Sequence, residues 1–97
     1  MKAEIFNFNR WINETNSAKL RDKFDKILRK SGFTVLNLSE HHFQPYGYTA
    51  LWLLGESHFA VHTFPEENKT YIELSSCNRK LYNKFLKLLQ DGGTLFK

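Results

Sequence analysis

The sequence predicts one α+β domain over residues 1–97, a two-layer sandwich in which two helices pack on one face of an antiparallel sheet. Three observations favour this fold. Hydrophobic residues make up 41% of the chain and aromatic residues 15%, a composition typical of a packed core. Two segments space their apolar residues as amphipathic helices do, and the segments between them alternate as strands do. Short turns join those strands, which predicts antiparallel neighbours.

Each predicted helix has a capping residue and an apolar stripe. The first follows a cluster of capping residues at 13–16 and ends near Lys30, with Gly32 in the position of a C-cap glycine. Asn78 can cap the second helix. Two glycines, Gly92-Gly93, stop this helix, and the tail after them has room for a last short strand. The stripes are Leu20, Phe24, Ile27 and Leu28 in the first helix and Leu81, Phe85, Leu88 and Leu89 in the second.

Five segments are predicted as strands, at residues 3–8, 33–43, 48–54, 58–64 and 70–76. The second is expected to place Thr34, Leu36 and Leu38 on one face. The third is almost wholly apolar, so we expect a central strand that is covered on both sides. The fourth alternates, so that His58 and His62 share one face. Between the third and fourth strands lies a tight polar corner.

The net charge of +4 is unevenly distributed along the chain. Between Lys30 and Lys69 there is no Lys or Arg, although four glutamates and all four histidines lie there. The basic residues fall mostly in the predicted helices, where a charged face is usually a solvated surface. This distribution argues against a nucleic-acid-binding role and suits a cationic ligand better.

The sequence also bears on membrane association and redox environment. It has no run of 18 apolar residues, and its first residues are acidic and polar where a signal peptide has an apolar core. We therefore expect a cytoplasmic protein with no membrane segment. The single cysteine, Cys77, cannot form an internal disulfide, so it is either an ordinary buried thiol or a reactive one.

The histidines and the cysteine allow several interpretations. His58 and His62, with Cys77 or with a histidine from the pair His41-His42, could form a zinc site, although closely paired ligands are lacking. Cys77 and His62 could form a nucleophilic pair, because a thiolate needs a neighbouring imidazole. Each of these residues could equally be an ordinary core or edge residue.

Four motifs in the second half of the chain occur together in a specific order. F-x-P-Y-G-Y-T runs from Phe43 to Thr49, and G-E-S-H surrounds Ser57. H-T-F-P-E then begins at His62, and Cys77 lies twenty residues after Ser57. In this combination the sequence resembles the pyruvoyl-dependent S-adenosylmethionine decarboxylase family, in its small single-domain prokaryotic form. The flanking segments match that family only in pattern.

This resemblance implies that the chain cuts itself between Glu56 and Ser57, giving a β chain of residues 1–56 and an α chain of residues 57–97. The Ser57 hydroxyl would attack the Glu56 carbonyl and turn the amide into an ester. Elimination and hydrolysis would then leave a pyruvoyl group on the α chain. A strained corner between two strands would favour such an attack.

The resemblance also implies the reaction and its catalytic residues. The pyruvoyl cofactor derived from Ser57 would form a Schiff base with the α-amine of S-adenosylmethionine and take up the electrons left by departing CO₂. His62 resembles the base for the elimination step, and Thr49 resembles a hydroxyl residue that assists processing. Cys77 would return a proton to the substrate. The product would supply aminopropyl groups for the synthesis of polyamines such as spermidine.

Substrate binding and oligomeric state follow from the same resemblance. Phe43 looks like the aromatic that stacks on adenine, Glu66 like the carboxylate that binds the ribose, and Phe6 or Phe8 like a second stacking ring. Aromatic faces also suit the sulfonium charge. Two protomers pair in the small forms of the family, so the resemblance implies a homodimer with shared sites. A chain this short also buries little surface alone, which favours dimerisation. Each site would combine Ser57 and Cys77 of one protomer with Phe43, Thr49, His62 and Glu66 of the other.

Three departures from the family pattern leave alternatives open. An asparagine follows the first-strand aromatic where the family has an acidic residue, and Asn78 follows Cys77 where many relatives have glycine. The C-terminus is also shorter than in the usual small form. One alternative keeps the chemistry but acts on arginine or ornithine. Another is an uncleaved, non-catalytic binding or regulatory subunit, which the intact Ser57, His62 and Cys77 argue against.

Overall fold

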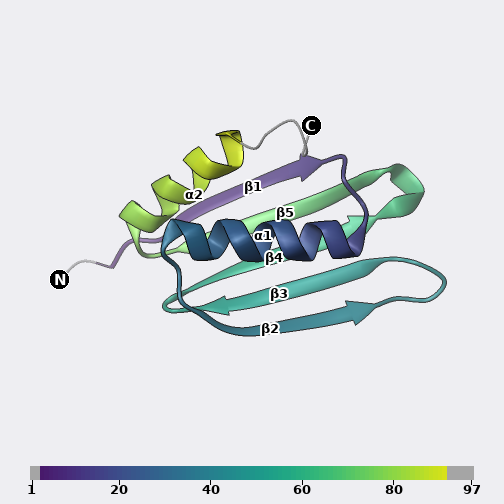
Figure 1. The fold of residues 1–97 in the computed structure, drawn as a ribbon, viewed down its shortest axis with the longest axis horizontal. Coiled ribbons are helices and arrows are strands. Elements are labelled where there is room, and N and C mark those ends of the chain that lie inside the picture. Colours follow the sequence, from purple (N-terminus) through teal and green to yellow (C-terminus); the bar gives the residue numbers. More distant parts are fainter. Residues whose placement is uncertain (1–2, 92–97) are drawn as a thin grey trace.

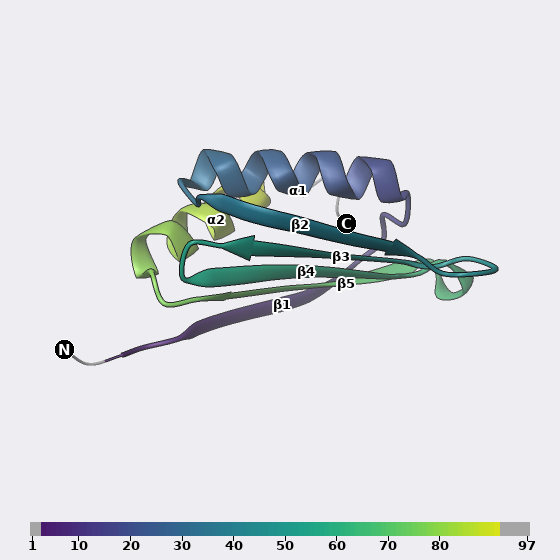
Figure 2. The same ribbon diagram turned by 90° about the horizontal axis from the view of Figure 1, so that it is seen from below.

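One antiparallel sheet and two helices make up the computed structural model, which describes residues 3–91. The strand order is β1-β5-β4-β3-β2, and both helices lie on the same face of the sheet (Figures 1 and 2). The predicted α+β two-layer sandwich is therefore confirmed. The elements are β1 (Phe6–Ile12), α1 (Ser17–Ser31), β2 (Val35–His42), β3 (Tyr48–Leu54), β4 (Ser57–Phe64), the 3-10 helix η1 (Pro65–Glu67), β5 (Lys69–Ser76) and α2 (Arg79–Asp91).

Both helices begin and pack as the sequence predicts. Asn16 caps α1, because its Oδ1 accepts the Lys19 N–H at 3.0 Å, and Asn78 caps α2 through the Leu81 N–H in the same way. Helix α1 ends at Gly32, whose φ of 106° favours glycine. A Cβ at Gly32 would also lie 2.9 Å from Leu81 Cδ2, so this position sets the close contact between the helices. Neither described helix is long and apolar enough to cross a bilayer.

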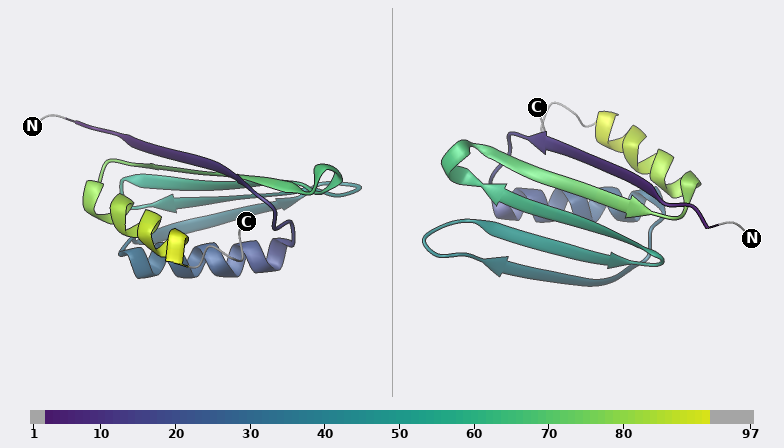
Figure 3. Two further views of the ribbon diagram at one scale, coloured as in Figure 1. Left: turned by 90° about the horizontal axis from the view of Figure 1, so that it is seen from above. Right: turned by 180° about the vertical axis from the view of Figure 1, so that it is seen from behind.

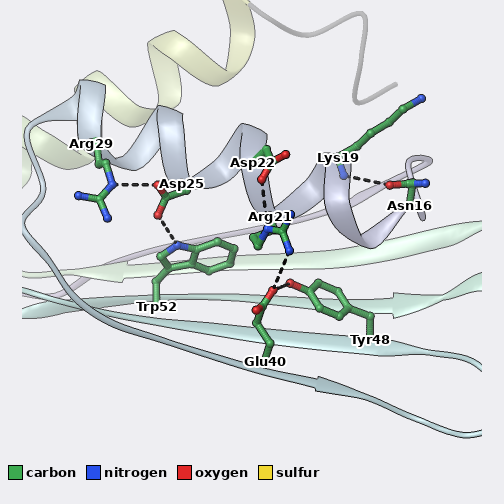
Figure 4. Close-up of polar contacts among 9 residues, drawn as sticks. All are labelled: Asn16, Lys19, Arg21, Asp22, Asp25, Arg29, Glu40, Tyr48 and Trp52. Carbon is green, nitrogen blue, oxygen red and sulfur yellow. Dashed lines mark hydrogen bonds and ion pairs between the residues drawn. The ribbon is translucent and has the colours of Figure 1, made fainter.

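An aromatic cluster fills the core between sheet and helices. The ring of Phe59 on β4 lies 4.8 Å from Phe24 of α1, 5.4 Å from Phe85 of α2 and 5.5 Å from Trp52 of β3. The indole N–H of Trp52 donates to Asp25 Oδ1 at 3.1 Å, so the one polar atom of this buried side chain is satisfied (Figure 4). The cluster ties Phe59, two residues after Ser57 on β4, to both helices and to β3.

Three strand predictions are wrong in detail. The first strand was expected at residues 3–8, but β1 begins at Phe6 and continues to Ile12, because it pairs with β5 along that whole length. A register shift between Val35 and Asn37 turns Leu36 outward, leaving it 59% exposed rather than on one face with its neighbours. The predicted stop of the second helix and the predicted short strand after it lie outside the described residues.

The third correction concerns β3, which was expected to be central and covered on both sides. The central strand is β4, and β3 lies between it and the edge strand β2. Its side chains alternate between the helices and the opposite, open face, where Leu51 is 49% and Leu53 is 53% exposed. Figure 3, right, shows this open face with α1 behind the sheet. Within one chain, therefore, an apolar strand face remains in contact with solvent.

Candidate active site

The predicted site residues fall into two groups at opposite ends of β4. Ser57 is the first residue of this strand and His62 is five residues further on, roughly 16 Å away at about 3.3 Å per residue. In Figure 1, the β3–β4 turn and the end of β5 lie at the left, while the β2–β3 loop and η1 lie at the right. The first group is called the cleavage cluster and consists of the predicted residues Glu56, Ser57 and Cys77 together with Ser76. The second is the face cluster and consists of the predicted residues Phe43, Thr49 and His62 together with Tyr71.

The cleavage cluster surrounds the Glu56–Ser57 peptide bond. Glu56 lies in the two-residue turn between β3 and β4 with a φ of 58°, a conformation that costs a non-glycine residue about 1–2 kcal/mol. Ser57 is 8% exposed, and its Oγ donates to Ser76 Oγ at 2.7 Å. The Cys77 thiol donates to the Glu56 carbonyl oxygen at 3.2 Å.

Each contact in the cleavage cluster has a chemical consequence. A donor on a carbonyl oxygen draws electrons from the carbonyl carbon, so the Cys77 thiol favours nucleophilic attack on Glu56. The hydroxyl of Ser57, the next residue along the chain, is a nucleophile adjacent to this carbonyl. The strain at Glu56 is released if the bond that follows it breaks. The cluster can therefore activate its own backbone.

The face cluster lies on the open face of the sheet. Thr49 and His62 are directly paired across β3 and β4, with 3.0 Å between Thr49 Oγ1 and His62 Nδ1, and the Tyr71 ring stacks beside the imidazole. Phe43 is 49% exposed, and its ring lies 4.5 Å from that of His41, which pairs with Thr49. The cluster thus presents an aromatic ring, a hydroxyl and an imidazole to the same side.

The loop that carries Phe43 is closed by a glycine. The Phe43 N–H donates to the Gly47 carbonyl at 2.8 Å, and Gly47 has a φ of 117°, which favours a residue without a side chain. The loop lines a shallow hollow of about 320 Å³ together with Thr63 and Pro65. Glu66 follows in η1 and is exposed. Phe43 and Glu66 are thus at the same end of the sheet.

Phe6 lies at the opposite end from Phe43. It pairs with Ser76 on the face that carries the helices, where its ring lies 5.7 Å from the Tyr82 ring and the Arg79 guanidinium lies 5.0 Å from its centroid. Phe8 faces the same side and packs against Phe85. Phe6 is therefore the nearer of the two to the cleavage cluster, and one chain does not bring it together with Phe43.

Two alternative sites are not formed within the chain. His58 and His62 share the open face but are four residues apart on one strand, roughly 13 Å, which is too far for a common ion. Residues 3–91 contain no group of three or more His, Cys, Asp or Glu side chains placed to hold a metal. Cys77 lies beside Glu56, just before β4 begins, whereas His62 lies towards the other end of that strand, so a single chain does not pair them.

Sequence reasoning missed Ser76, which contacts Ser57 directly. It is 1% exposed and lies opposite Ser57 in the β4–β5 register. Its position just before Cys77 at the end of a predicted strand could have indicated this. The pairing of that strand with β4, however, comes from the tertiary structure and not from the local pattern.

A second missed polar cluster links α1 to the sheet. The Tyr48 hydroxyl donates to Glu40, whose Oε1 lies 3.8 Å from Arg21 Nη1 (Figure 4). Burial of Tyr48, and then its hydrogen bond to Glu40, raise the pKa of Tyr48 above its usual value of 10. Arg21 opposes this rise only weakly.

The raised pKa of Tyr48 predicts a loss of stability in alkali. Above pH 10 the phenol ionises in the unfolded chain while it stays protonated in the folded one, so the free energy of unfolding falls as pH rises, by at most about 1.4 kcal/mol per pH unit. Urea unfolding between pH 9 and 11.5 should show a shallower fall for Tyr48→Phe. Tyr46→Phe, which removes an exposed hydroxyl, is the control, and equal slopes in all three chains would contradict the prediction.

Comparison with known proteins identifies the family of this fold and site. The family described as S-adenosylmethionine decarboxylase matches residues 4–92, nearly the whole chain. The chain belongs to the S-adenosylmethionine decarboxylase family. The family matches the one that the motifs from Phe43 to Cys77 predicted, so that prediction is confirmed.

Relatives in this S-adenosylmethionine decarboxylase family differ in how much they share with the chain. A proenzyme of Prochlorococcus marinus strain MIT 9211 is 37% identical over a match that covers 80% of this chain and 70% of the length of that relative. Proenzyme 2 of Bacillus cereus ATCC 14579 is 53% identical over 47 residues, which are 48% of this chain and 38% of that protein. The match to the proenzyme of strain MIT 9313 covers 50% of that relative, so the chain spans half or less of several relatives.

A solved structure supports the fold at the level of the whole chain. The adenosylmethionine decarboxylase of Aquifex aeolicus superposes with a TM-score of 0.72 at 19% identity, covering 93% of this chain and 81% of that one. At this identity the likeness concerns the fold. It agrees with the two-layer arrangement of one antiparallel sheet and two helices.

Proposed function

We propose that this chain is the precursor of a pyruvoyl-dependent enzyme that decarboxylates S-adenosylmethionine. The observation that carries the proposal is the cleavage cluster in a member of this family. A strained Glu56 precedes a buried serine, and a thiol donates to the carbonyl that the serine would attack. In this proposal the chain breaks between Glu56 and Ser57 into residues 1–56 and 57–97.

The surroundings of Ser57 fit a pyruvoyl group. Ser57 is buried at the start of a strand in which Phe59 and Val61 are fully buried in the core, so a new chain end at Ser57 would stay in place. Cys77 lies beside the same bond and could hold a proton close to that end. When formed, the group supplies an electrophilic carbonyl for the substrate amine and an acceptor for the electrons left by CO₂.

The chain's own side chains have separate tasks in this proposal. Cys77 delivers a proton to the substrate carbon that has lost CO₂. His62, oriented by its contact with Thr49, removes a proton during the elimination that completes processing. Phe43 stacks on the adenine and Glu66 binds the ribose hydroxyls. Cys77 must stay reduced for its task, which fits a cytoplasmic location.

The separation of the two clusters favours a homodimer with shared sites. The roughly 16 Å between Ser57 and His62 is too long for one proton transfer, so one chain cannot use both on the same group. A two-fold pairing of open faces, with the strands of the two sheets running in opposite directions, would bring the end of the sheet that carries the Glu56–Ser57 bond in one protomer to the face cluster of the other. The Ser57 side chain itself lies on the helix face of the uncleaved chain. The pairing would also cover the exposed side chains Trp11, Leu51, Leu53 and Phe64.

Shared sites predict complementation between two defective chains. Co-expressed Ser57→Ala and His62→Ala chains would form hybrid dimers in which one site has both an intact Ser57 and the partner's intact His62. The His62→Ala chain should then be cleaved in the mixture, although neither variant matures alone. The double variant Ser57→Ala/His62→Ala, mixed with His62→Ala, is the matched control and should give no rescue. Absence of rescue in the first mixture, with a parent chain that cleaves, would contradict shared sites.

Mass spectrometry of the purified chain tests the proposed self-cleavage. We expect two fragments that divide between Glu56 and Ser57, the second of which begins with a pyruvoyl group. A single intact chain after prolonged incubation would argue for the non-catalytic alternative. Fragments without CO₂ release from S-adenosylmethionine, but with release from arginine or ornithine, would change the substrate and keep the chemistry.

A further inference from the structure

Ser76 is the direct hydrogen-bond partner of the serine at the proposed cleavage point. Its Oγ accepts the Ser57 hydroxyl at 2.7 Å, and both side chains are buried. The two residues are directly paired in the β4–β5 register. A hydrogen bond this short between buried groups fixes the direction in which the Ser57 hydroxyl points.

The other contacts of Ser76 require Ser57 to be the donor in this pair. A hydroxyl has one proton to donate and two lone pairs that accept. The Asn78 N–H donates to Ser76 Oγ at 3.0 Å, and the Ser76 hydroxyl points to the Asn78 carbonyl at 3.4 Å. With its proton directed to Asn78, Ser76 can meet Ser57 only as an acceptor.

Helix α2 holds Ser76 in this orientation. Asn78, which contacts Ser76 through both backbone groups, also caps the helix by accepting the Leu81 N–H at 3.0 Å, and its carbonyl accepts the Tyr82 N–H. The helix in turn packs on the core through Phe85. Rotation of the Ser76 side chain would therefore break contacts at the start of α2.

From this geometry we infer that Ser76 is a positioning residue for self-cleavage, which orients the Ser57 hydroxyl for its attack on Glu56. The inference rests on the proposed function. In the step concerned, the bond from Ser57 Oγ to the Glu56 carbonyl carbon forms, the bond from that carbon to the Ser57 nitrogen breaks, and the hydroxyl proton ends on that nitrogen. Because the Ser57 hydroxyl proton points to Ser76, the lone pairs of Ser57 Oγ remain free to attack the carbonyl carbon.

The inference separates processing from catalysis. Conversion of Ser57 into a pyruvoyl group removes Oγ, so the contact with Ser76 exists only in the precursor. Loss of the Ser76 hydroxyl should therefore slow cleavage much more than it lowers turnover per cleaved chain. A general distortion of this end of the sheet would lower both rates together.

Comparison of Ser76→Ala with Ser75→Ala tests the inference. Ser75 is the adjacent residue on β5 and faces the open side, so the control makes the same chemical change on the opposite face. Cleavage of purified precursor is followed by mass spectrometry, with hydroxylamine added to trap the ester that forms first. Melting midpoints of the precursors report any loss of folding.

We expect Ser76→Ala to slow ester formation roughly 10- to 100-fold, as for the loss of one orienting hydrogen bond, with turnover per cleaved chain lowered less than about threefold. Ser76→Thr, which keeps the hydroxyl, should restore at least part of the rate. Equal cleavage rates for Ser76→Ala and Ser75→Ala would overturn this inference and leave the proposed function standing. Equal losses of cleavage and turnover in Ser76→Ala would do the same. A parent chain that never cleaves would overturn the proposed function as well.

Discussion

A Ser57→Ala chain is expected to remain intact at full length, whereas the parent separates into residues 1–56 and 57–97. The substitution removes the only atom that can form the ester, Ser57 Oγ, and leaves the strained Glu56 turn in place. Because the pyruvoyl group derives from the same side chain, the variant should also lack decarboxylase activity altogether. Denaturing electrophoresis and intact mass after matched incubation provide the measurement.

The same variant needs a control for folding. Removing Ser57 Oγ leaves the buried hydroxyl of Ser76 without one of its partners, which costs about 1 kcal/mol. The melting midpoint should therefore fall only slightly from that of the uncleaved parent. Ser75→Ala, one strand away and outside the cleavage cluster, should cleave at the parent rate. Two fragments from Ser57→Ala would show that another residue or a contaminating protease breaks the chain.

Replacement of Cys77 by alanine is expected to damage turnover far more than cleavage. The thiol donates to the Glu56 carbonyl at 3.2 Å, so its loss removes one weak donor from the bond under attack and should slow cleavage several-fold. Loss of a positioned acid should lower turnover per cleaved chain roughly 10²- to 10⁴-fold. The measurement is CO₂ release divided by the cleaved fraction from intact mass.

Cys77→Ser distinguishes the two tasks of this residue. The serine hydroxyl still donates to the Glu56 carbonyl, so cleavage should recover toward the parent rate. It is a much weaker acid than a thiol, so turnover should stay low. Normal turnover in Cys77→Ala would remove this residue from the proton-transfer step, and normal turnover in Cys77→Ser would show that acidity is not what matters there.

Local patterns predicted the helices well because caps and stripes are short-range features. Leu20, Phe24 and Leu28 are all fully buried, and the helix ends at Gly32 as expected. The position of β1 could not be predicted in the same way, because its pairing with β5 determines where it begins and ends. The outward turn of Leu36 likewise depends on a register shift that the alternation of residues does not reveal.

The candidate site was predicted as a set of residues divided between two protomers, without the contacts that each residue makes within its own chain. The motifs identified Ser57, His62 and Cys77, and the structure places Cys77 against the Glu56 carbonyl. The strand predicted at residues 58–64 already implied that His62 lies some way along the strand from Ser57, but the pairing of His62 with Thr49 comes from the register between β3 and β4. Ser76 escaped notice because its significance depends on the register between β4 and β5. The roles of all these residues stay predictions.

Release of labelled CO₂ from carboxyl-labelled S-adenosylmethionine tests the central proposal most directly. The assay uses protein shown by mass to be cleaved between Glu56 and Ser57, with the Ser57→Ala chain as the blank. We predict continuous release over many turnovers from the cleaved protein and none from the blank. A fully cleaved protein that releases no CO₂ from S-adenosylmethionine would contradict the proposed function, whatever it releases from arginine or ornithine.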